Sequence, residues 1–210
     1  MKRYSAVVLC LLFVLTCARL ASAASFSADA AYVLGKSDST EMRGFLAGVE
    51  GEVYSNIFLE GRFLNVSPAK DEEGSTESLL YGALSYRVLQ EADLDVLVGG
   101  GYTTFNIQLP AVDDNDGDPE TDQPSSEKGD GFFGKLGVRF TPIPRLVVSG
   151  DVAYSPGLSF EDNDSRTLIT GRVLLSYEVL EQVSVQGTVV RTSVGTANTL
   201  LYGGGITLQF

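Results

Sequence analysis

Apolar and polar residues alternate at every second position along most of the chain that follows residue 24. The segment from Thr199 to Phe210 shows the pattern clearly, because one set of alternate positions is apolar and the other is mostly small or polar. A period of two is typical of β-strands whose two faces meet different surroundings. Clusters of Gly, Pro, Asn, Asp and Ser separate such segments, and together they predict ten strands. We expect these strands at about 25–35, 42–55, 57–67, 78–89, 93–108, 131–142, 145–156, 165–179, 183–193 and 199–210.

The connections between these segments alternate in length. Those near 55–56, 90–93, 142–145 and 180–182 are tight, whereas 36–41, 68–77, 109–130, 157–164 and 194–198 are mostly longer. Short turns at one end and longer loops at the other, with an even number of strands, are typical of a transmembrane barrel with both termini at the turn end. All seven prolines fall in connections or at strand ends, where no ladder hydrogen bond is lost. The sequence therefore predicts an all-β, antiparallel up-and-down transmembrane β-barrel of about ten strands, with eight or twelve as alternatives.

The two faces of the predicted strands differ in charge. The apolar faces hold no ionisable residue at the positions counted, whereas the opposite faces hold seven acids and five bases. These twelve residues are Asp29, Glu50, Glu52, Glu60, Arg62, Arg87, Asp95, Lys135, Arg139, Asp151, Arg172 and Glu178. The period alone leaves open which face is outside, since a soluble barrel such as a lipocalin would turn the charges toward water.

The heights of the aromatic residues on the apolar faces distinguish the two possibilities. Seven are expected at the loop end: Tyr32, Phe45, Phe63, Tyr102, Phe132, Tyr154 and Tyr202. Five are expected at the turn end: Phe26, Tyr86, Phe140, Tyr177 and Phe210. Two aromatic belts with aliphatic residues between them are typical of membrane interfaces, and a soluble core would not sort aromatics by height. We therefore expect the apolar face outside, against lipid.

The N-terminal segment predicts a secretory signal peptide over residues 1–23, followed by one barrel domain over 24–210. It has a basic start, an apolar run from Ala6 to Thr16 and small residues at Ala21 and Ala23. A lipidated Cys17 is the alternative. Both cysteines lie in this segment, so the mature chain would have no disulfide or thiolate metal site. Its loss removes three cations and takes the formal charge from −12 to −15, which excludes a nucleic-acid-binding protein.

The last predicted strand resembles the C-terminal signature of bacterial outer-membrane β-barrels. The residues that carry the resemblance are Tyr202, Ile206, Leu208 and Phe210 on its apolar face. The resemblance implies recognition by the barrel-assembly machinery, a location in the cell outer membrane with both termini periplasmic, and outer-membrane lipid and lipopolysaccharide as partners.

The charged inward face predicts ion pairs, because ionised groups inside a narrow barrel must be paired or hydrated. Lys135 and Arg139 are candidates to pair with Asp151, which can also meet Arg172 on the following strand. A salt-bridged lumen that stiffens the barrel and a narrow path for solutes or ions both fit the pattern. Mid-strand glycines on nine apolar faces are expected to permit the coiling of a narrow barrel, with close packing in an oligomer as the alternative.

The longest predicted loop, 109–130, holds eight acids against Lys128. Asp114, Asp116 and Asp118 are weak candidates for a divalent cation, since Val112 and Gln123 break the EF-hand pattern. Catalysis is not expected, because the chain contains no histidine and the Ser-His and Asp-His sites of outer-membrane hydrolases and proteases are therefore impossible. No cofactor is expected.

The segment GKLGVRFTPIPRLVVSGDVAYSPGLSFEDNDSRTLITGRVLLSYEVLEQVSVQG, residues 134–187, and the segment ASFSADAAY, residues 24–32, resemble the YfaZ family of predicted outer-membrane proteins. The motif YSPGLS is the most specific part of this resemblance, which implies no activity and no site residues. We therefore expect an outer-membrane barrel with a structural or surface role. A narrow passive channel and a surface adhesin or cation-binding protein are the alternatives.

Overall fold

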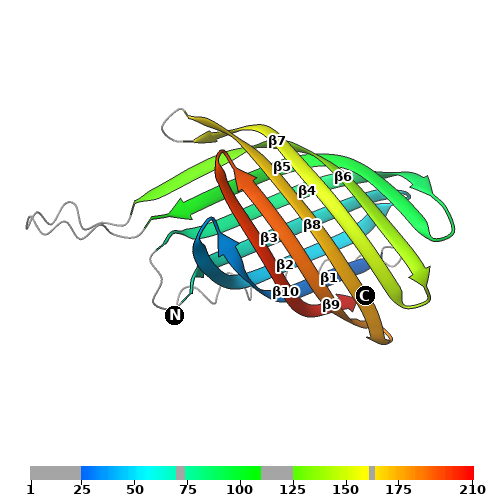
Figure 1. The fold of residues 1–210 in the computed structure, drawn as a ribbon. Helices are drawn as coiled ribbons and strands as arrows, with labels where there is room; N and C mark the ends of the chain where they lie inside the picture. The colour runs from blue at the N-terminus through cyan, green and yellow to red at the C-terminus, as the bar shows by residue number, and fades with distance from the viewer. Residues whose placement is uncertain (1–24, 70–73, 110–124, 161–163) are drawn as a thin grey trace, which may run out of the picture.

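The chain forms a closed barrel of ten antiparallel strands in the computed structural model, which describes residues 25–69, 74–109, 125–160 and 164–210 (Figure 1). The strands are β1 (Phe26–Ser37), β2 (Thr40–Tyr54), β3 (Ile57–Pro68), β4 (Thr76–Gln90), β5 (Leu94–Gln108), β6 (Ser126–Ile143), β7 (Leu146–Phe160), β8 (Ser165–Leu180), β9 (Val183–Val194) and β10 (Ala197–Gln209). The predicted fold class and the strand number are confirmed.

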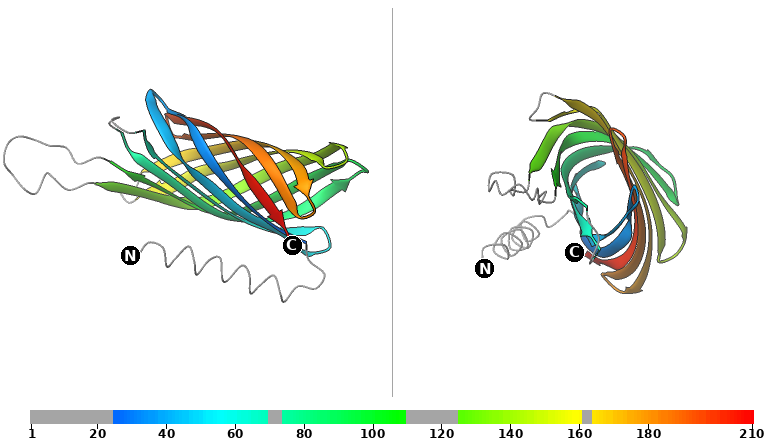
Figure 2. Two further views of the ribbon diagram at one scale, coloured as in Figure 1. Left: turned by 90° about the horizontal axis from the view of Figure 1, so that it is seen from below. Right: turned by 60° about the vertical axis from the view of Figure 1, so that its left-hand side comes forward.

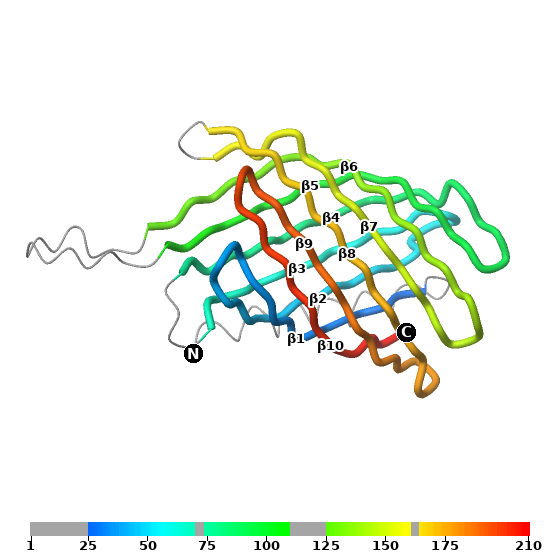
Figure 3. The backbone as a smooth tube through the Cα atoms, viewed as in Figure 1, coloured from blue at the N-terminus to red at the C-terminus, as the bar shows by residue number. Residues whose placement is uncertain are grey.

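Each strand pairs with its neighbours in the chain, and β1 also pairs with β10, which closes the sheet. Figure 2 shows the resulting ring of strands in its right-hand view. The strands on the near and far walls cross at an angle in Figure 3, because all of them are tilted against the barrel axis. Among the described residues, no helix is long and apolar enough to cross a bilayer.

The turn end of the barrel is built from four tight connections, as predicted. The strand that enters each of them carries a register shift, in β2, β4, β6 and β8. Asn56, Arg145 and Gln182 have φ of 65°, 73° and 74° in three of these turns. A bulge beside a residue of left-handed conformation adds twist to the hairpin and brings the next strand back into register.

The loop end differs from the prediction in two of its five connections. The segments 36–41 and 194–198 were expected to be longer loops, but the strands continue to Ser37 and Thr40, and to Val194 and Ala197. Each connection is therefore a two-residue turn, in which Asp38 and Gly195 have φ of 50° and 58°. The β1–β2 and β9–β10 hairpins consequently end close to the barrel wall.

The strands β6 and β7 extend beyond their predicted bounds at the same end. The prediction began β6 at residue 131 and ended β7 at 156, whereas the ladder continues to Ser126 and Phe160. The motif YSPGLS lies inside β7, where a register shift between Ser155 and Leu158 accommodates Pro156. Proline has no N–H to donate to a ladder, so a bulge is where a strand tolerates it.

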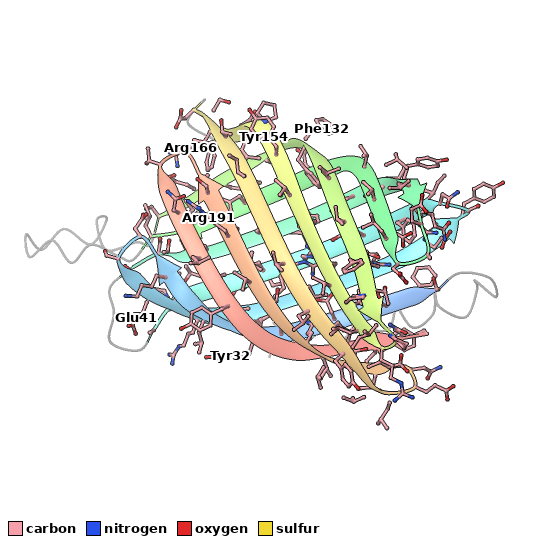
Figure 4. All side chains as sticks on the ribbon, turned by 45° about the vertical axis from the view of Figure 1, so that its right-hand side comes forward. Tyr32, Glu41, Phe132, Tyr154, Arg166 and Arg191 are labelled. Carbon is pink, nitrogen blue, oxygen red and sulfur yellow. The ribbon has the colours of Figure 1, made fainter. Side chains whose placement is uncertain are left out.

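The predicted orientation of the two faces is confirmed. On β4, the side chain of Leu84 is 55% exposed on the outer surface, whereas that of its neighbour Ala83 is 3% exposed inside the barrel. The aromatic residues of both belts lie outside, and Phe45 contacts Phe63 at a ring distance of 5.6 Å. Side chains project from the outer wall at both ends of the barrel in Figure 4, where Tyr32, Phe132 and Tyr154 mark the belt at the loop end.

Several inward glycines permit the close approach of neighbouring strands. A Cβ atom at Gly203 or Gly205 of β10 would meet a backbone carbonyl oxygen of β1. A Cβ atom at Gly134, on the outer face, would meet nothing within 4 Å. On the outer face, a Cβ atom at Gly100 would lie 2.9 Å from the carbonyl oxygen of Phe133. The prediction that the outer glycines permit coiling stays a prediction.

Two predictions lie outside the described residues. They are the signal peptide over 1–23 and the cation candidates Asp114, Asp116 and Asp118. Within the ranges that the structure describes, no group of three or more acidic residues is arranged to hold a metal ion.

Candidate functional site: the charged lumen

Buried charges from four strands meet in one network at the middle of the lumen. Arg62 of β3 contacts Glu60 on its own strand, and its Nη1 lies 3.3 Å from Oδ1 of Asp151 on β7. Arg172 of β8 donates from Nε to Oδ2 of Asp151 at 3.1 Å. Lys135 of β6 pairs with Glu60 across the lumen. We call these five residues the central charge network.

The strands fix these residues at matching heights. Asp151 and Arg172 are cross-strand partners on β7 and β8. On β3, Glu60 and Arg62 are separated by one outward residue, so both side chains point inward. The side chains of these two residues are 4% and 6% exposed. Because ionised groups so deeply buried are costly unless paired, the network must form for the barrel to close.

An aromatic residue completes the network on the β4 side. The hydroxyl of Tyr81 donates to Oε1 of Glu60 at 3.1 Å, and the Arg62 guanidinium lies 5.3 Å from the centre of the Tyr81 ring. Phe133 packs edge-on against the same ring, at a centroid distance of 5.4 Å. These contacts hold Arg62 in place with a hydrogen-bonded carboxylate on one side and an aromatic face on another.

A second group of charges lies nearer the turn end. Arg139 pairs with Glu50 across the lumen. Arg87 of β4 pairs with Glu52 of β2 at 3.4 Å and lies 3.6 Å from Asp95 of β5. These charges are less buried than the central charge network, so water can solvate them as well.

The sequence predicted which residues face the lumen better than it predicted their partners. Asp151 pairs with Arg172 as predicted, but Lys135 pairs with Glu60 and Arg139 with Glu50 instead of with Asp151. The reason is that the predictions considered neighbouring strands, whereas these pairs reach across the lumen between β6 and the β2–β3 hairpin. The remaining predicted positions are Asp29, beside Gly48 in the wall, and Glu178, at the turn end of β8.

The charges line a cavity of about 500 Å³ in the turn half of the barrel. Its walls include Glu50, Glu60, Arg139 and Asp151. Residues at the turn end, among them Gln209, line it as well, so the cavity opens at that end.

The loop half of the lumen is filled by apolar side chains. The sequence interpretation expected side chains such as Phe105 to fill the lumen in part, but it did not identify this half as the packed one. We call the apolar side chains of this half the apolar plug; it consists of Val33, Leu46, Leu64, Val66, Leu79, Phe105, Leu158, Val190 and Leu201. Leu46 and Leu201 are each 1% exposed. The void between the plug and the central charge network measures about 10 Å³, which is at the lower limit for a single water molecule.

A signal for the plug was present in the sequence. On β3, the inward positions change from Glu60 and Arg62 to Leu64 and Val66 toward the loop end. The interpretation did not compare the heights of the inward residues along the strands. An apolar stretch that is confined to one half of the inward face predicts a lumen that is packed in that half.

Comparisons with known proteins concern the fold. The chain resembles outer-membrane β-barrels of known structure. An outer membrane channel from Pseudomonas putida F1 is 11% identical, with a TM-score of 0.47, over 89% of this chain and 95% of that chain. The N-terminal β-barrel domain of Pseudomonas aeruginosa OprF is 10% identical, with a TM-score of 0.40, over 88% and 97%. Ail, the attachment invasion locus protein of Yersinia pestis, is 14% identical, with a TM-score of 0.38, over 89% and 97%.

No protein-family model and no curated protein matches the chain. The resemblance to the YfaZ family therefore stays a prediction. The same holds for recognition of the last strand by the assembly machinery. The structure places Tyr202, Ile206, Leu208 and Phe210 on the outer surface, where β10 pairs with β1 and Phe210 exchanges backbone hydrogen bonds with Phe26.

The lumen is suited to electrostatic pairing rather than to nucleophilic chemistry. Ser85, Ser176 and Ser184 are buried inside the barrel, but the sequence holds no histidine to activate a hydroxyl. What the arrangement provides is a rigid, charged cavity that opens at one end and is closed by the apolar plug at the other.

Proposed function

We propose that the chain is an integral outer-membrane β-barrel protein with a structural or surface role and a closed lumen. The observation that carries this proposal is the distribution of polarity across the barrel wall. Large apolar side chains cover the outside between two aromatic belts, and ionised groups lie inside. A lipid bilayer selects this arrangement, whereas water selects the opposite one.

The extent of the apolar exterior supports a membrane environment. Exposed side chains such as Leu80, Leu136, Val173 and Tyr202 occur on strands all around the barrel. A soluble monomer rarely exposes a continuous apolar patch larger than a few hundred Å². A band that encircles the whole barrel therefore fits a protein surrounded by hydrocarbon.

The height of this band also suits a membrane. Tyr202 and Phe210 lie on the same outer face of the last strand, eight residues apart. At about 3.3 Å per residue and a strand tilt near 40°, they are separated by roughly 20 Å along the membrane normal. That is close to the apolar band of about 25 Å in barrels of this class.

We place the loop end at the cell surface and the turn end in the periplasm. The longest connection between described strands, 109–125, lies at the loop end, and the turn end has tight connections only. This asymmetry is the usual one in outer-membrane barrels. In this orientation the charged cavity opens toward the periplasm, and the apolar plug separates it from the outside.

A pair of single-cysteine variants tests the membrane orientation of the wall. Residues 24–210 contain no cysteine, so Leu84→Cys and Ala83→Cys each carry one spin label, outside and inside the wall. In phospholipid vesicles, we expect oxygen, which dissolves in lipid, to relax the label at residue 84 strongly and the label at 83 weakly. Fractionation with the outer membrane and heat-modifiable migration on gels should accompany this result. A water-soluble monomer that needs no detergent would contradict the proposal.

A narrow passive channel is the second candidate function, because the cavity of about 500 Å³ already spans the turn half of the barrel. Single-channel conductance in planar bilayers distinguishes the two functions. We expect the wild-type chain to be silent and Leu46→Ala with Leu201→Ala to produce conductance steps, since both side chains belong to the plug. Leu84→Ala removes the same atoms from the outer surface and should remain silent. Steady conductance by the wild type would favour the channel.

A further inference from the structure

Three basic residues lie close together on the outer surface at the loop end, above the aromatic belt. Lys36 of β1 and Arg191 of β9 are the cross-strand partners of Leu200, one on each side of it. They are therefore two strand spacings apart, or about 10 Å. Arg43 of β2 is the cross-strand partner of Leu34. Leu34 lies two residues before Lys36, on the same face of β1. We call Lys36, Arg43 and Arg191 the basic rim; all three are exposed.

The acids near the basic rim do not neutralise it. Glu41 is the cross-strand partner of Lys36, and Asp38 in the adjoining turn accepts a hydrogen bond from the backbone N–H of Asn198 at 3.2 Å. Among the residues that the structure describes, three cations thus stand against two acids. The two arginines are cross-strand partners of Leu34, Ser67, Leu200 and Gly171 only. In a chain with a formal charge of −12, this is a local excess of positive charge on the outer wall.

Another cation at the loop end, the half-buried Arg166, is used differently. Arg166 donates hydrogen bonds to Glu127 and to Asp164, both at 2.8 Å. Its guanidinium also lies 4.4 Å from the centre of the Phe160 ring. Arg191, which is labelled in Figure 4, makes a weaker contact, a hydrogen bond of 3.4 Å to the side-chain oxygen of Asn198. The arginines of the basic rim are therefore available to an external anion.

An apolar groove of about 290 Å³ lies below the basic rim on β1, β2 and β10. Ala30 of β1, Ala47 of β2 and Gly204 of β10 form its floor, and Tyr32 and Phe45 stand at its upper end. Small residues between large ones hollow the outer wall at this place. The volume equals that of about ten water molecules at ~30 Å³ each, which suits a segment of acyl chain.

We propose that β9, β10, β1 and β2 form a binding site for a phosphorylated, acylated lipid of the surrounding leaflet. This inference rests on the proposed outer-membrane function. The phosphate is held by the basic rim, since guanidinium groups pair with phosphate oxygens in a bidentate geometry. An acyl chain occupies the groove below it. The two-residue turns of the β1–β2 and β9–β10 hairpins are too short to extend over the site themselves.

A second copy of the chain is a less suitable occupant. In a two-fold symmetric dimer through this face, the same patch meets itself, and the basic rims of the two protomers approach each other. Like charges brought together in this way disfavour association. An anionic lipid pairs its phosphate with the basic rim and covers the apolar groove with its acyl chain.

Lipid binding by the purified chain in a neutral detergent tests the site. The probes are deep-rough lipopolysaccharide, the same lipid after enzymatic removal of its phosphates, and free inorganic phosphate. We expect the phosphorylated lipid to bind at least tenfold more tightly than the dephosphorylated one, and inorganic phosphate to bind weakly. The triple variant Lys36→Gln, Arg43→Gln, Arg191→Gln should lose this preference.

Matched control variants test the basic rim and the apolar groove separately, each against the same substitution made elsewhere on the barrel. Arg191→Gln should weaken binding, whereas Arg145→Gln, at an exposed position in a turn of the opposite end, should not. Gly204→Leu fills the groove, and Gly134→Leu adds the same side chain on β6, where a Cβ meets nothing within 4 Å. Both glycine variants should fold, because the nearest atom to a Cβ at Gly204 is 3.5 Å away.

The outcomes distinguish the two proposals. If the wild type inserts into membranes but binds both forms of the lipid equally, or if the triple variant binds as the wild type does, the lipid site is refuted and the outer-membrane function stands. A stable dimer that excludes the lipid also refutes the site. If the wild type is soluble without detergent, both proposals fail together.

Discussion

Removal of the Asp151 carboxylate should weaken the barrel strongly. Asp151 is the acceptor for both Arg62 and Arg172, at 3.3 and 3.1 Å, and its side chain is 8% exposed. Replacement by alanine leaves Arg62 with Glu60 but takes from Arg172 its only ion pair among those of the described residues. The variant Asp151→Ala therefore places an uncompensated cation inside the wall.

The magnitude follows from the burial of this pair. Breaking a buried ion pair by removing one partner costs about 3–5 kcal/mol, mostly because the remaining charge stays buried. With a urea dependence of about 2 kcal/mol per molar, the unfolding midpoint should fall by about 1.5–2.5 M. The double variant Asp151→Leu, Arg172→Leu removes both charges, and we expect it to recover at least half of this loss.

Urea unfolding in phospholipid vesicles, followed by circular dichroism, measures the effect; the chain contains no tryptophan. Asp164→Ala is the control, since Asp164 pairs with Arg166 at 2.8 Å but is 54% exposed. An exposed pair of this kind contributes at most about 1 kcal/mol. If Asp151→Ala lowers the midpoint no more than Asp164→Ala does, the central charge network is solvated and does not stabilise the barrel.

Three further predictions concern the wall, the last strand and the longest loop. Gly203→Val should prevent closure, because its Cβ meets a carbonyl oxygen of β1, whereas Gly134→Val should yield a heat-modifiable barrel; equal yields would contradict this account. Phe210→Ala should lower the amount of assembled barrel in the outer membrane of cells more than it lowers refolding of the purified chain, and equal losses would argue against recognition by the assembly machinery. Deletion of 113–125 should leave gel migration unchanged, because the deleted segment lies beyond Gln108 and Ser126, the last paired residues of β5 and β6, and should abolish any binding of host surfaces or cations; binding that survives the deletion would exclude an adhesin role for this loop.

The sequence was sufficient to predict the architecture because the alternation of residues within each strand indicates which of its faces points out of the barrel. Alternation along β4, with Ala83 inward and Leu84 outward, is a local property that needs no knowledge of the other strands. The same local reasoning identified the inward charges. This reasoning predicted a β6 that begins too late in the chain. The polar residues from Ser126 onward were interpreted as a loop, although they pair with β5.

The candidate site was harder to predict because its contacts are made across the lumen. Lys135 meets Glu60 through the interior of the ring, at a separation that depends on barrel radius and shear rather than on chain order. The apolar plug depends on the height of each inward residue, which becomes clear only once the register of all strands is known. The basic rim was missed for a related reason: Lys36 and Arg191 become neighbours only when β1 pairs with β10.

The pairing of β1 with β10 has a consequence for how the molecule is made. This seam joins the earliest and latest strands of the ladder, so it is the contact with the greatest separation in sequence. Until it forms, the open sheet presents two unpaired edges, β1 and β10, each able to recruit a foreign strand. The chain must therefore be kept from aggregation throughout translation and export, and a slow final step that zips the seam is expected to determine how quickly mature protein accumulates.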